Sequence, residues 1–178
     1  MDLRIKKTRD SIERAFIELR AEKPLNKITV KELAEKAVIS KATFYLHYKD
    51  IYELSDILQD GLVAEVIDSI SDPKKVFDDP AFFTSELEAA FNSKKEEIDI
   101  LFSQSENVFV DKIEAHISEI VFRMFPDYAN MLDKKMILTV MIHGCFHAYI
   151  KYSVEDRKTL IDIIGRISES VAKSLQDL

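Results

Sequence analysis

Apolar residues recur every three or four positions along most of the chain, which is the spacing of one face of an α-helix. The first such stripe lies in residues 3–22, opposite a charged face, and consists of Leu3, Ile12, Ala15, Phe16 and Leu19. A second stripe, between residues 50 and 70, consists of Leu54, Leu58, Leu62, Val66 and Ile70. Both predict amphipathic helices, and Ser71-Asp72-Pro73 is expected to end the second one.

Two short helices are predicted between these long ones. Thr29 is followed three positions later by Glu32, which is the arrangement of an N-terminal capping box, and we expect this helix to reach about residue 37. Ser40 can cap another helix over residues 41–48, and Asp50 can cap the long helix that follows. Since only two or three residues separate the two short helices, they are typical of a helix-turn-helix unit.

Beyond residue 72 the pattern predicts helices over residues 81–91, 94–103, 107–125, 131–152 and 155–176, and a linker over residues 72–80. The composition agrees, because 3 Gly and 4 Pro in 178 residues are far fewer than the roughly 12% of an average protein. We therefore predict an all-α fold of about nine helices. It is divided into a three-helix domain at residues 1–50 and a helical domain at residues 51–178, in which residues 51–70 form a linking helix.

The composition also excludes several classes of protein. A single cysteine, Cys145, can form neither an intrachain disulfide nor a cysteine metal cage. The charged amino-terminal stretch does not resemble a secretory leader, and no window approaches the roughly 20 apolar residues of a membrane span. We expect a cytoplasmic protein. No nucleophile–base pair, phosphate-binding loop or convincing metal-ligand set is found, so we expect neither an enzyme nor a cofactor.

Charge is distributed unevenly along the chain. Residues 1–50 contain 12 Lys and Arg against 8 Asp and Glu, whereas residues 51–178 contain 13 against 24, within a net charge of −7. A basic amino-terminal domain joined to an acidic remainder suggests a polyanionic partner that is met at one end only. Charge alone does not distinguish this interpretation from chance variation.

The predicted third helix carries side chains that suit the major groove of DNA. Its first turn is the part of a recognition helix that meets base edges, and holds Ser40, Lys41, Ala42 and Thr43. Lys41 can donate to the acceptors of guanine, Ala42 can contact a thymine methyl, and Thr43 can serve a base or a phosphate. The residues expected to contact phosphate are Tyr45 and His47 further along the helix, and Thr29 and Lys49 at helix starts.

Residues 8–60 resemble the DNA-binding domain of the TetR/AcrR family of bacterial transcriptional regulators. The run Thr43-Phe44-Tyr45-Leu46-His47-Tyr48 is similar to the family signature T-[LF]-Y-x-H-F, and the sequence from Ile28 is similar to its I-T-V-x-E-L-A-x-x-A pattern. The resemblance implies a helical homodimer with a variable C-terminal domain that binds a small molecule. We accordingly expect a ligand-responsive repressor that binds a palindromic operator in double-stranded DNA.

Three residues depart from the family pattern. Val38 stands where the family usually has a glycine in the helix-turn-helix corner, and a β-branched residue disfavours a positive φ, so we expect a different turn. Ala42 replaces another frequent glycine, and Ile51 stands where a phosphate-contacting lysine is frequent. These departures leave an alternative open, in which the protein is a family member with weakened DNA binding that acts as a protein-binding adaptor.

The C-terminal domain offers candidates for an effector pocket and a dimer interface. For a small apolar effector, we predict a pocket formed by Phe102, Phe122, Met141, Phe146 and His147. His143 and His147 share a helix face, but Cys145 points away from it, so we favour a structural or pocket role over a metal site. The predicted dimer interface consists of Tyr149, Leu160, Ile164, Ile167, Val171 and Leu175.

Overall fold

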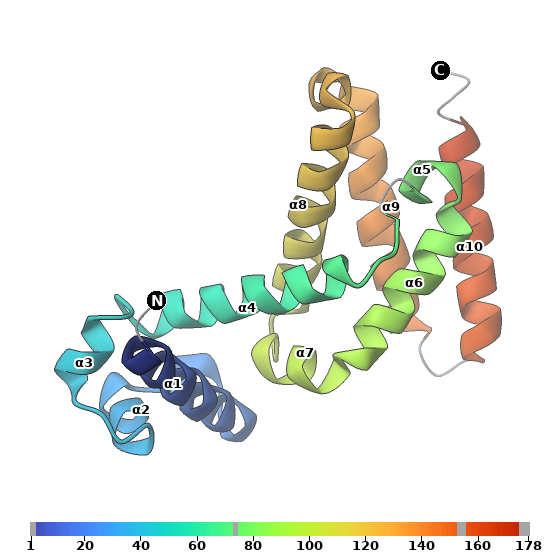
Figure 1. Cartoon of the computed structure of the whole chain (residues 1–178). Coiled ribbons are helices and arrows are strands. Elements are labelled where there is room, and N and C mark those ends of the chain that lie inside the picture. Colours follow the sequence, from blue (N-terminus) through green and yellow to red (C-terminus); the bar gives the residue numbers. More distant parts are fainter. Residues whose placement is uncertain (1–2, 73–74, 153–155, 175–178) are drawn as a thin grey trace. The chain divides into compact units, whose positions relative to one another are not determined.

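The computed structural model describes residues 3–72, 75–152 and 156–174, and every regular element in those ranges is helical (Figure 1). The helices are α1 (Leu3–Glu22), α2 (Val30–Lys36), α3 (Lys41–Tyr45), α4 (Ile51–Asp68), α5 (Lys75–Asp78), α6 (Pro80–Ser93), α7 (Lys95–Leu101), α8 (Glu106–Met124), α9 (Leu132–Lys151) and α10 (Arg157–Ser174). Two 3₁₀ helices, η1 (Leu25–Lys27) and η2 (Pro126–Asn130), complete the set. The predicted all-α fold is confirmed. The predicted linker contains α5, a single turn too short to show a helical period.

The chain forms two compact units. The first, which we call the head, comprises Met1–Leu62 together with Glu96–Ser105; the second, the body, comprises Val63–Lys95 and Glu106–Leu178. The domain boundary expected at residue 50 stays a prediction. The segment 96–105 belongs to the head although it lies between two helices of the body in sequence.

The core of the head forms around the apolar stripe predicted for α1. Ile12 and Phe16 on that stripe are fully buried, as are Leu33 of α2 and Phe44 of α3. Burying each such side chain contributes about 1.5–3 kcal/mol. Ser11 of α1 also donates a hydrogen bond to the carbonyl of Ala37 at 3.0 Å, which fixes the end of α2 against α1.

A buried polar joint holds segment 96–105 within the head. Gln59 of α4 donates from Nε2 to the carbonyl oxygen of Leu101 at 2.9 Å, and Arg20 of α1 approaches the same oxygen at 3.5 Å. Arg20 is 5% exposed and also donates to the carbonyl of Lys23. Burial lowers the pKa of its guanidinium. These bonds satisfy a carbonyl at the C-terminal end of α7, which has no partner within its own helix.

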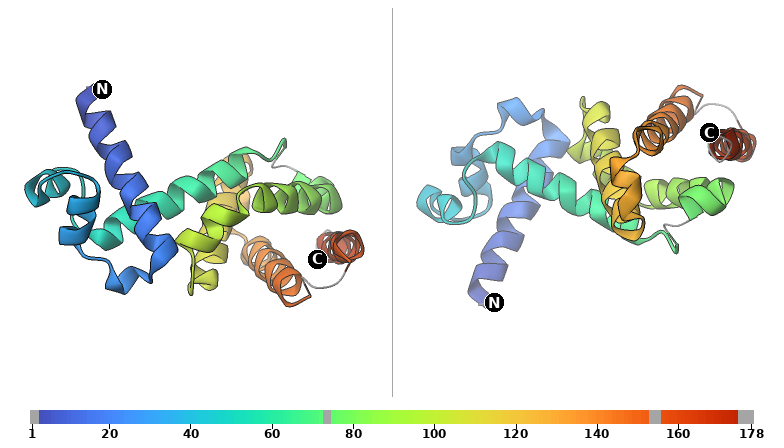
Figure 2. Two further views of the ribbon diagram at one scale, coloured as in Figure 1. Left: turned by 90° about the horizontal axis from the view of Figure 1, so that it is seen from below. Right: turned by 90° about the horizontal axis from the view of Figure 1, so that it is seen from above.

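The body is built from α6, α8, α9 and α10, and α10 (red) lies beside α6 (green) in both views of Figure 2. Gly165 of α10 explains this close approach, since a Cβ there would lie 3.0 Å from the Cβ and 3.1 Å from the Cα of Ala81. The core of α8 consists of Phe109, Val110, Ile113, Ile117 and Val121. No helix in the described ranges has the length and apolarity required to cross a membrane.

Candidate nucleic-acid interface and ligand cavity

The two short helices of the helix-turn-helix unit, α2 and α3, each begin at the N-terminal cap that the sequence predicts. The amide of Glu32 donates to the hydroxyl of Thr29 at 3.3 Å, and the amide of Thr43 donates to the hydroxyl of Ser40 at 3.0 Å. These bonds satisfy amides that the first turns of α2 and α3 leave without partners. Both predicted caps are confirmed, as is the cap at Asp50, whose Oδ1 accepts from the amides of two residues of α4.

The predicted extent of α3 to residue 48 is wrong, because the helix ends at Tyr45. The chain turns there and buries Tyr48, which is 2% exposed. Its phenol donates to Glu13 at 2.7 Å and accepts a hydrogen bond from Arg9 at 3.4 Å. Burial of Tyr48 and its hydrogen bond to Glu13 raise the pKa of the phenol to about 12, against the opposing effect of Arg9. Tertiary contacts with α1 therefore end the helix earlier than local propensity indicates.

We expected Val38 to give a turn between α2 and α3 that differs from one built on glycine, and this expectation is wrong. Val38 has a φ of 57°, which is the left-handed conformation that a glycine would adopt. The amide of Ile39 donates to the carbonyl of Ala34 at 2.9 Å, and the amide of Val38 donates to that of Glu35 at 3.2 Å. This pair of bonds is a Schellman motif. The turn is thus retained, with a β-branched residue in a strained conformation.

The predicted DNA-contacting residues reach solvent along α3 and at the starts of α2 and α4. Those classed as exposed are Thr29, Ser40, Lys41, Ala42, Tyr45 and Lys49, and the half-buried ones are Thr43 and His47. The hydroxyls of Ser40 and Thr43 lie 2.9 Å apart. In contrast, Ile51 is 6% exposed, so it belongs to the core of the head and cannot replace a phosphate-contacting lysine.

Two exposed apolar side chains in this region were not assigned a role from the sequence. Leu46 is 83% exposed and Val38 is 89% exposed. An apolar side chain in the middle of a helical pattern is normally assigned to the core, so the pattern gave no signal for either. Both add apolar surface to the exposed side of the helix-turn-helix unit.

Residues 14–56 match the family model described as bacterial regulatory proteins, tetR family. This range contains the capped helices α2 and α3 and the left-handed turn between them. Over residues 14–56 the chain is therefore similar to the TetR family. Over 72 residues, the chain is also 35% identical to the "Uncharacterized HTH-type transcriptional regulator YxbF" of Bacillus subtilis (strain 168). That similarity covers 40% of the chain but only 19% of the relative's length.

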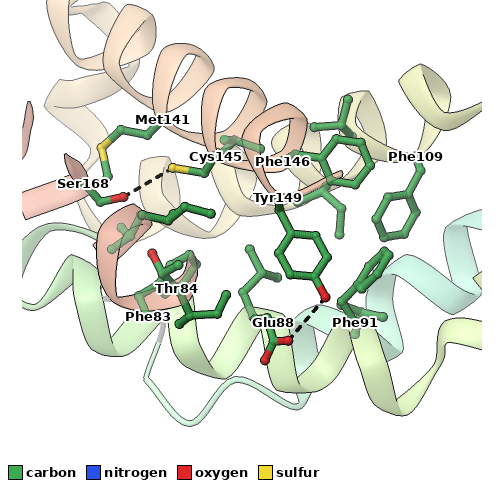
Figure 3. Close-up of a pocket in the computed structure, with 18 residues that line it drawn as sticks. Phe83, Thr84, Glu88, Phe91, Phe109, Met141, Cys145, Phe146, Tyr149 and Ser168 are labelled. Atoms are coloured by element: carbon green, nitrogen blue, oxygen red, sulfur yellow. Dashed lines mark hydrogen bonds between the residues drawn. The ribbon is translucent and has the colours of Figure 1, made fainter. Parts of the chain in front are cut away.

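The body contains a cavity that is partly open to solvent (Figure 3), and the empty space within it amounts to about 780 Å³ when the solvent-filled opening is included. It is enclosed by helices α6, α8, α9 and α10 with contributions from α4 and α5, and its lining residues are mostly apolar. They are Val66, Val76, Phe83, Thr84, Leu87, Glu88, Phe91, Phe109, Val110, Ile113, Met141, Ile142, Cys145, Phe146, Tyr149, Ile161, Ile164 and Ser168.

Of the five residues predicted for the pocket, Met141 and Phe146 line this cavity. The other three lie elsewhere. Phe102 is 2% exposed and belongs to the head, Phe122 is half-buried on α8, and His147 is exposed on α9, with its Nδ1 2.8 Å from the carbonyl of His143.

The sequence interpretation missed the contribution of α6 to the cavity. Five residues of this helix line the cavity at helical spacing, namely Phe83, Thr84, Leu87, Glu88 and Phe91. That stripe is visible in the sequence, but it does not indicate which helices it faces. At the other end of the cavity, Cys145 lies 3.3 Å from the hydroxyl of Ser168, and burial raises the pKa of its thiol.

The histidines of α9 lie outside the cavity lining. His143 Nε2 is 2.9 Å from Glu114 and 3.6 Å from Asp111, and its ring stacks on that of His147. Cys145 is directed to Ser168 instead, as its position relative to the histidines predicts. Within the described ranges, no group of three or more His, Cys, Asp and Glu is arranged to hold a metal ion.

The residues predicted for a dimer interface differ in how far contacts within the chain bury them. Leu160 and Ile164 are 8% and 4% exposed, and Tyr149 lines the cavity, so contacts within the chain already cover much of their surface. Ile167 is 54% exposed, Val171 is half-buried, and Leu175 lies outside the described residues.

Proposed function

We propose that this protein is a ligand-responsive repressor of the TetR family that binds a palindromic operator as a homodimer. The observation that carries the proposal is the exposed first turn of α3, where Lys41 and Ala42 face solvent at the N-terminal end of a helix set in a TetR-type unit. This is the part of a recognition helix that enters a major groove. A protein with this function acts in the cytoplasm, where it meets the chromosome.

The chemistry of the exposed residues supports specific roles on DNA. Lys41 reads guanine acceptors and Ala42 contacts a thymine methyl, while Tyr45 and Lys49 bind phosphate and set the register. The head also carries the positive excess of the chain, since residues 1–50 contain 12 Lys and Arg against 8 Asp and Glu. Electrostatic attraction to phosphate therefore adds to the contacts of α3.

A second copy of the chain is the proposed partner of the body. Several large apolar side chains of α9 and α10 are more than 40% exposed, and these are Leu132, Met136, Val140, Ile163 and Ile167. On α9 they recur every four residues, which places them on one helix face. Burying such residues against a twofold-related copy would present two α3 helices to half-sites roughly 34 to 36 Å apart, or a multiple of that spacing.

The cavity in the body is the proposed effector site. A ligand that binds there can release DNA only to the extent that it binds the DNA-free conformation more tightly than the DNA-bound one. Because the cavity wall is largely aromatic and aliphatic, an effector with a substantial apolar body fits it best.

Selection of duplexes from a random pool, at one stated salt concentration, tests DNA binding by the full-length protein. Enrichment of a palindromic sequence is expected. Lys41→Ala should then lose about 1–3 kcal/mol of binding free energy on that operator and little on a scrambled duplex. Lys31→Ala is the matched control, because Lys31 is an exposed lysine of the same unit that pairs with Glu35 at 3.9 Å.

Two results would contradict the proposal. Equal losses for Lys41→Ala on both duplexes would show that Lys41 does not read a base. Failure of the folded protein to enrich any sequence would favour the alternative of a protein-binding adaptor, which rests on the buried Ile51 in place of a phosphate-contacting lysine.

A further inference from the structure

The cavity in the body has an asymmetric distribution of charge. Among the described residues that line it, Glu88 is the one with an ionisable carboxylate, and no Lys, Arg or His joins it there. Its side chain is 13% exposed. A carboxylate in an apolar wall is costly to leave without compensation, so its partners decide what the cavity accepts.

The partners of Glu88 all approach one of its two oxygens. Tyr149 donates to Oε1 at 3.3 Å, Asn92 donates to it at 2.5 Å, and Arg157 forms an ion pair with it. Within the described ranges, no donor lies within hydrogen-bond distance of Oε2. Oε2 can therefore form a hydrogen bond or an ion pair with a bound molecule.

Aromatic rings cluster beside this carboxylate. The centroid of Phe91 lies 5.8 Å from that of Tyr149 and 5.6 Å from that of Phe109, and Phe146 lies 5.8 Å from Phe109. The ammonium of Lys95 lies 5.9 Å from the Phe91 centroid, so this ring already attracts one cation. The faces of aromatic rings are electron-rich and stabilise cations, most strongly where water is excluded.

We propose that the cavity binds an organic cation: a protonated amine or quaternary ammonium group lies against Glu88, Phe91 and Tyr149, and an apolar body extends towards Met141 and Cys145. Figure 3 shows these two sets of residues at different ends of the cavity. The inference rests on the proposed function of the body as an effector site and names the class of effector. Glu88 disfavours an anionic ligand at the same end.

Arg157 is expected to compete with such a ligand. It pairs with Glu88, yet its own side chain is 57% exposed, and ion pairs that face water contribute little stability. Removing Arg157 should therefore strengthen cation binding, whereas removing the charge of Glu88 should weaken it. A purely structural role of the pair would not give opposite effects on ligand affinity.

Isothermal titration calorimetry of the full chain tests this with three probes of one shape. They are phenylbutyl trimethylammonium, its neutral isostere with a tert-butyl group in place of the trimethylammonium, and the matching carboxylate. The cation should bind about tenfold more tightly than the neutral isostere, a ratio in the range of a desolvated cation–π contact assisted by a carboxylate. The carboxylate should bind more weakly than either.

The variants assign that preference to residues. Glu88→Gln should abolish the preference for the cation, and Arg157→Gln should raise cation affinity severalfold. The matched controls are Glu86→Gln on the same helix, whose carboxylate accepts from Ser71, and Arg166→Gln on α10, which pairs with Asp162. Both controls should leave the preference unchanged. If Glu88→Gln does not fold, Arg157→Gln still tests the proposal, because it leaves the carboxylate in place.

Each failure has a distinct meaning. Equal affinity for the cation and its neutral isostere, or no binding of the cation at millimolar concentration, would overturn the inference and leave DNA binding by the head unaffected. If the cation binds as expected but does not weaken operator binding, the inference stands and the ligand-responsive part of the proposed function is contradicted.

Discussion

Replacing Val38 with glycine is expected to stabilise the head. Val38 has a φ of 57°, and a non-glycine residue in this conformation costs about 1–2 kcal/mol. The side chain is 89% exposed, so removing it sacrifices almost no buried apolar surface. Glycine increases the entropy of the unfolded chain, which offsets about 0.4–1 kcal/mol of the gain. The net increase in the free energy of unfolding should be about 1 kcal/mol.

Urea denaturation followed by circular dichroism measures this change. Val38→Ala is the matched control, because alanine also removes the branched side chain but keeps a Cβ in the left-handed conformation, and it should stabilise less than glycine does. A Val38→Gly protein that is no more stable than the parent, or an alanine variant that equals it, would show that backbone strain at this turn is not the cause.

Three further predictions concern other contacts. Tyr48→Phe should lower the free energy of unfolding by about 1 kcal/mol through loss of the bond to Glu13. Because the folded pKa of Tyr48 is raised from 10.0 to about 12, its contribution is present below pH 10 and is lost as the pH rises to about 12; melts of both proteins over this range should therefore converge. Gly165→Ala should destabilise by about 1–3 kcal/mol through overpacking against Ala81, while Gly61→Ala, with nothing within 4 Å, should stabilise by up to about 1 kcal/mol; opposite signs in urea melts check this. Ile167→Asp, at a side chain 54% exposed in the single chain, should yield a folded monomer by sedimentation analysis, and an unchanged dimer would remove Ile167 from the interface.

Features set by neighbouring residues could be predicted from the sequence. The extent of α1 and the caps at Thr29 and Ser40 depend on short-range hydrogen bonds and one apolar stripe, and both were found correctly. The turn at Val38 was not, because its left-handed conformation is held by the Schellman bonds together with the bond from Ser11 to the carbonyl of Ala37. At this turn the tertiary contact with Ser11 therefore outweighs the preference of valine for a negative φ.

The lining of the cavity also depends on contacts between residues that are distant in sequence, and the sequence pattern does not reveal these contacts. Helical periodicity identifies which side of α9 is apolar, and it correctly placed Met141 and Phe146 in the cavity lining. It does not specify which helices pack together, so Phe102 was grouped with residues of the body although it belongs to the head. Glu88 was missed for the same reason, since its importance depends on Tyr149 and Arg157, which are distant in sequence.

The path of the chain has a consequence for building chimeric regulators. Segment 96–105 returns to the head, where Gln59 donates to the carbonyl of Leu101. A fragment that stops at Leu62 would leave Gln59 and the buried Arg20 without this acceptor. Transplanting the DNA specificity of this protein onto another sensor therefore requires two grafted pieces rather than one. A swap at a single junction should give an insoluble or poorly folded product.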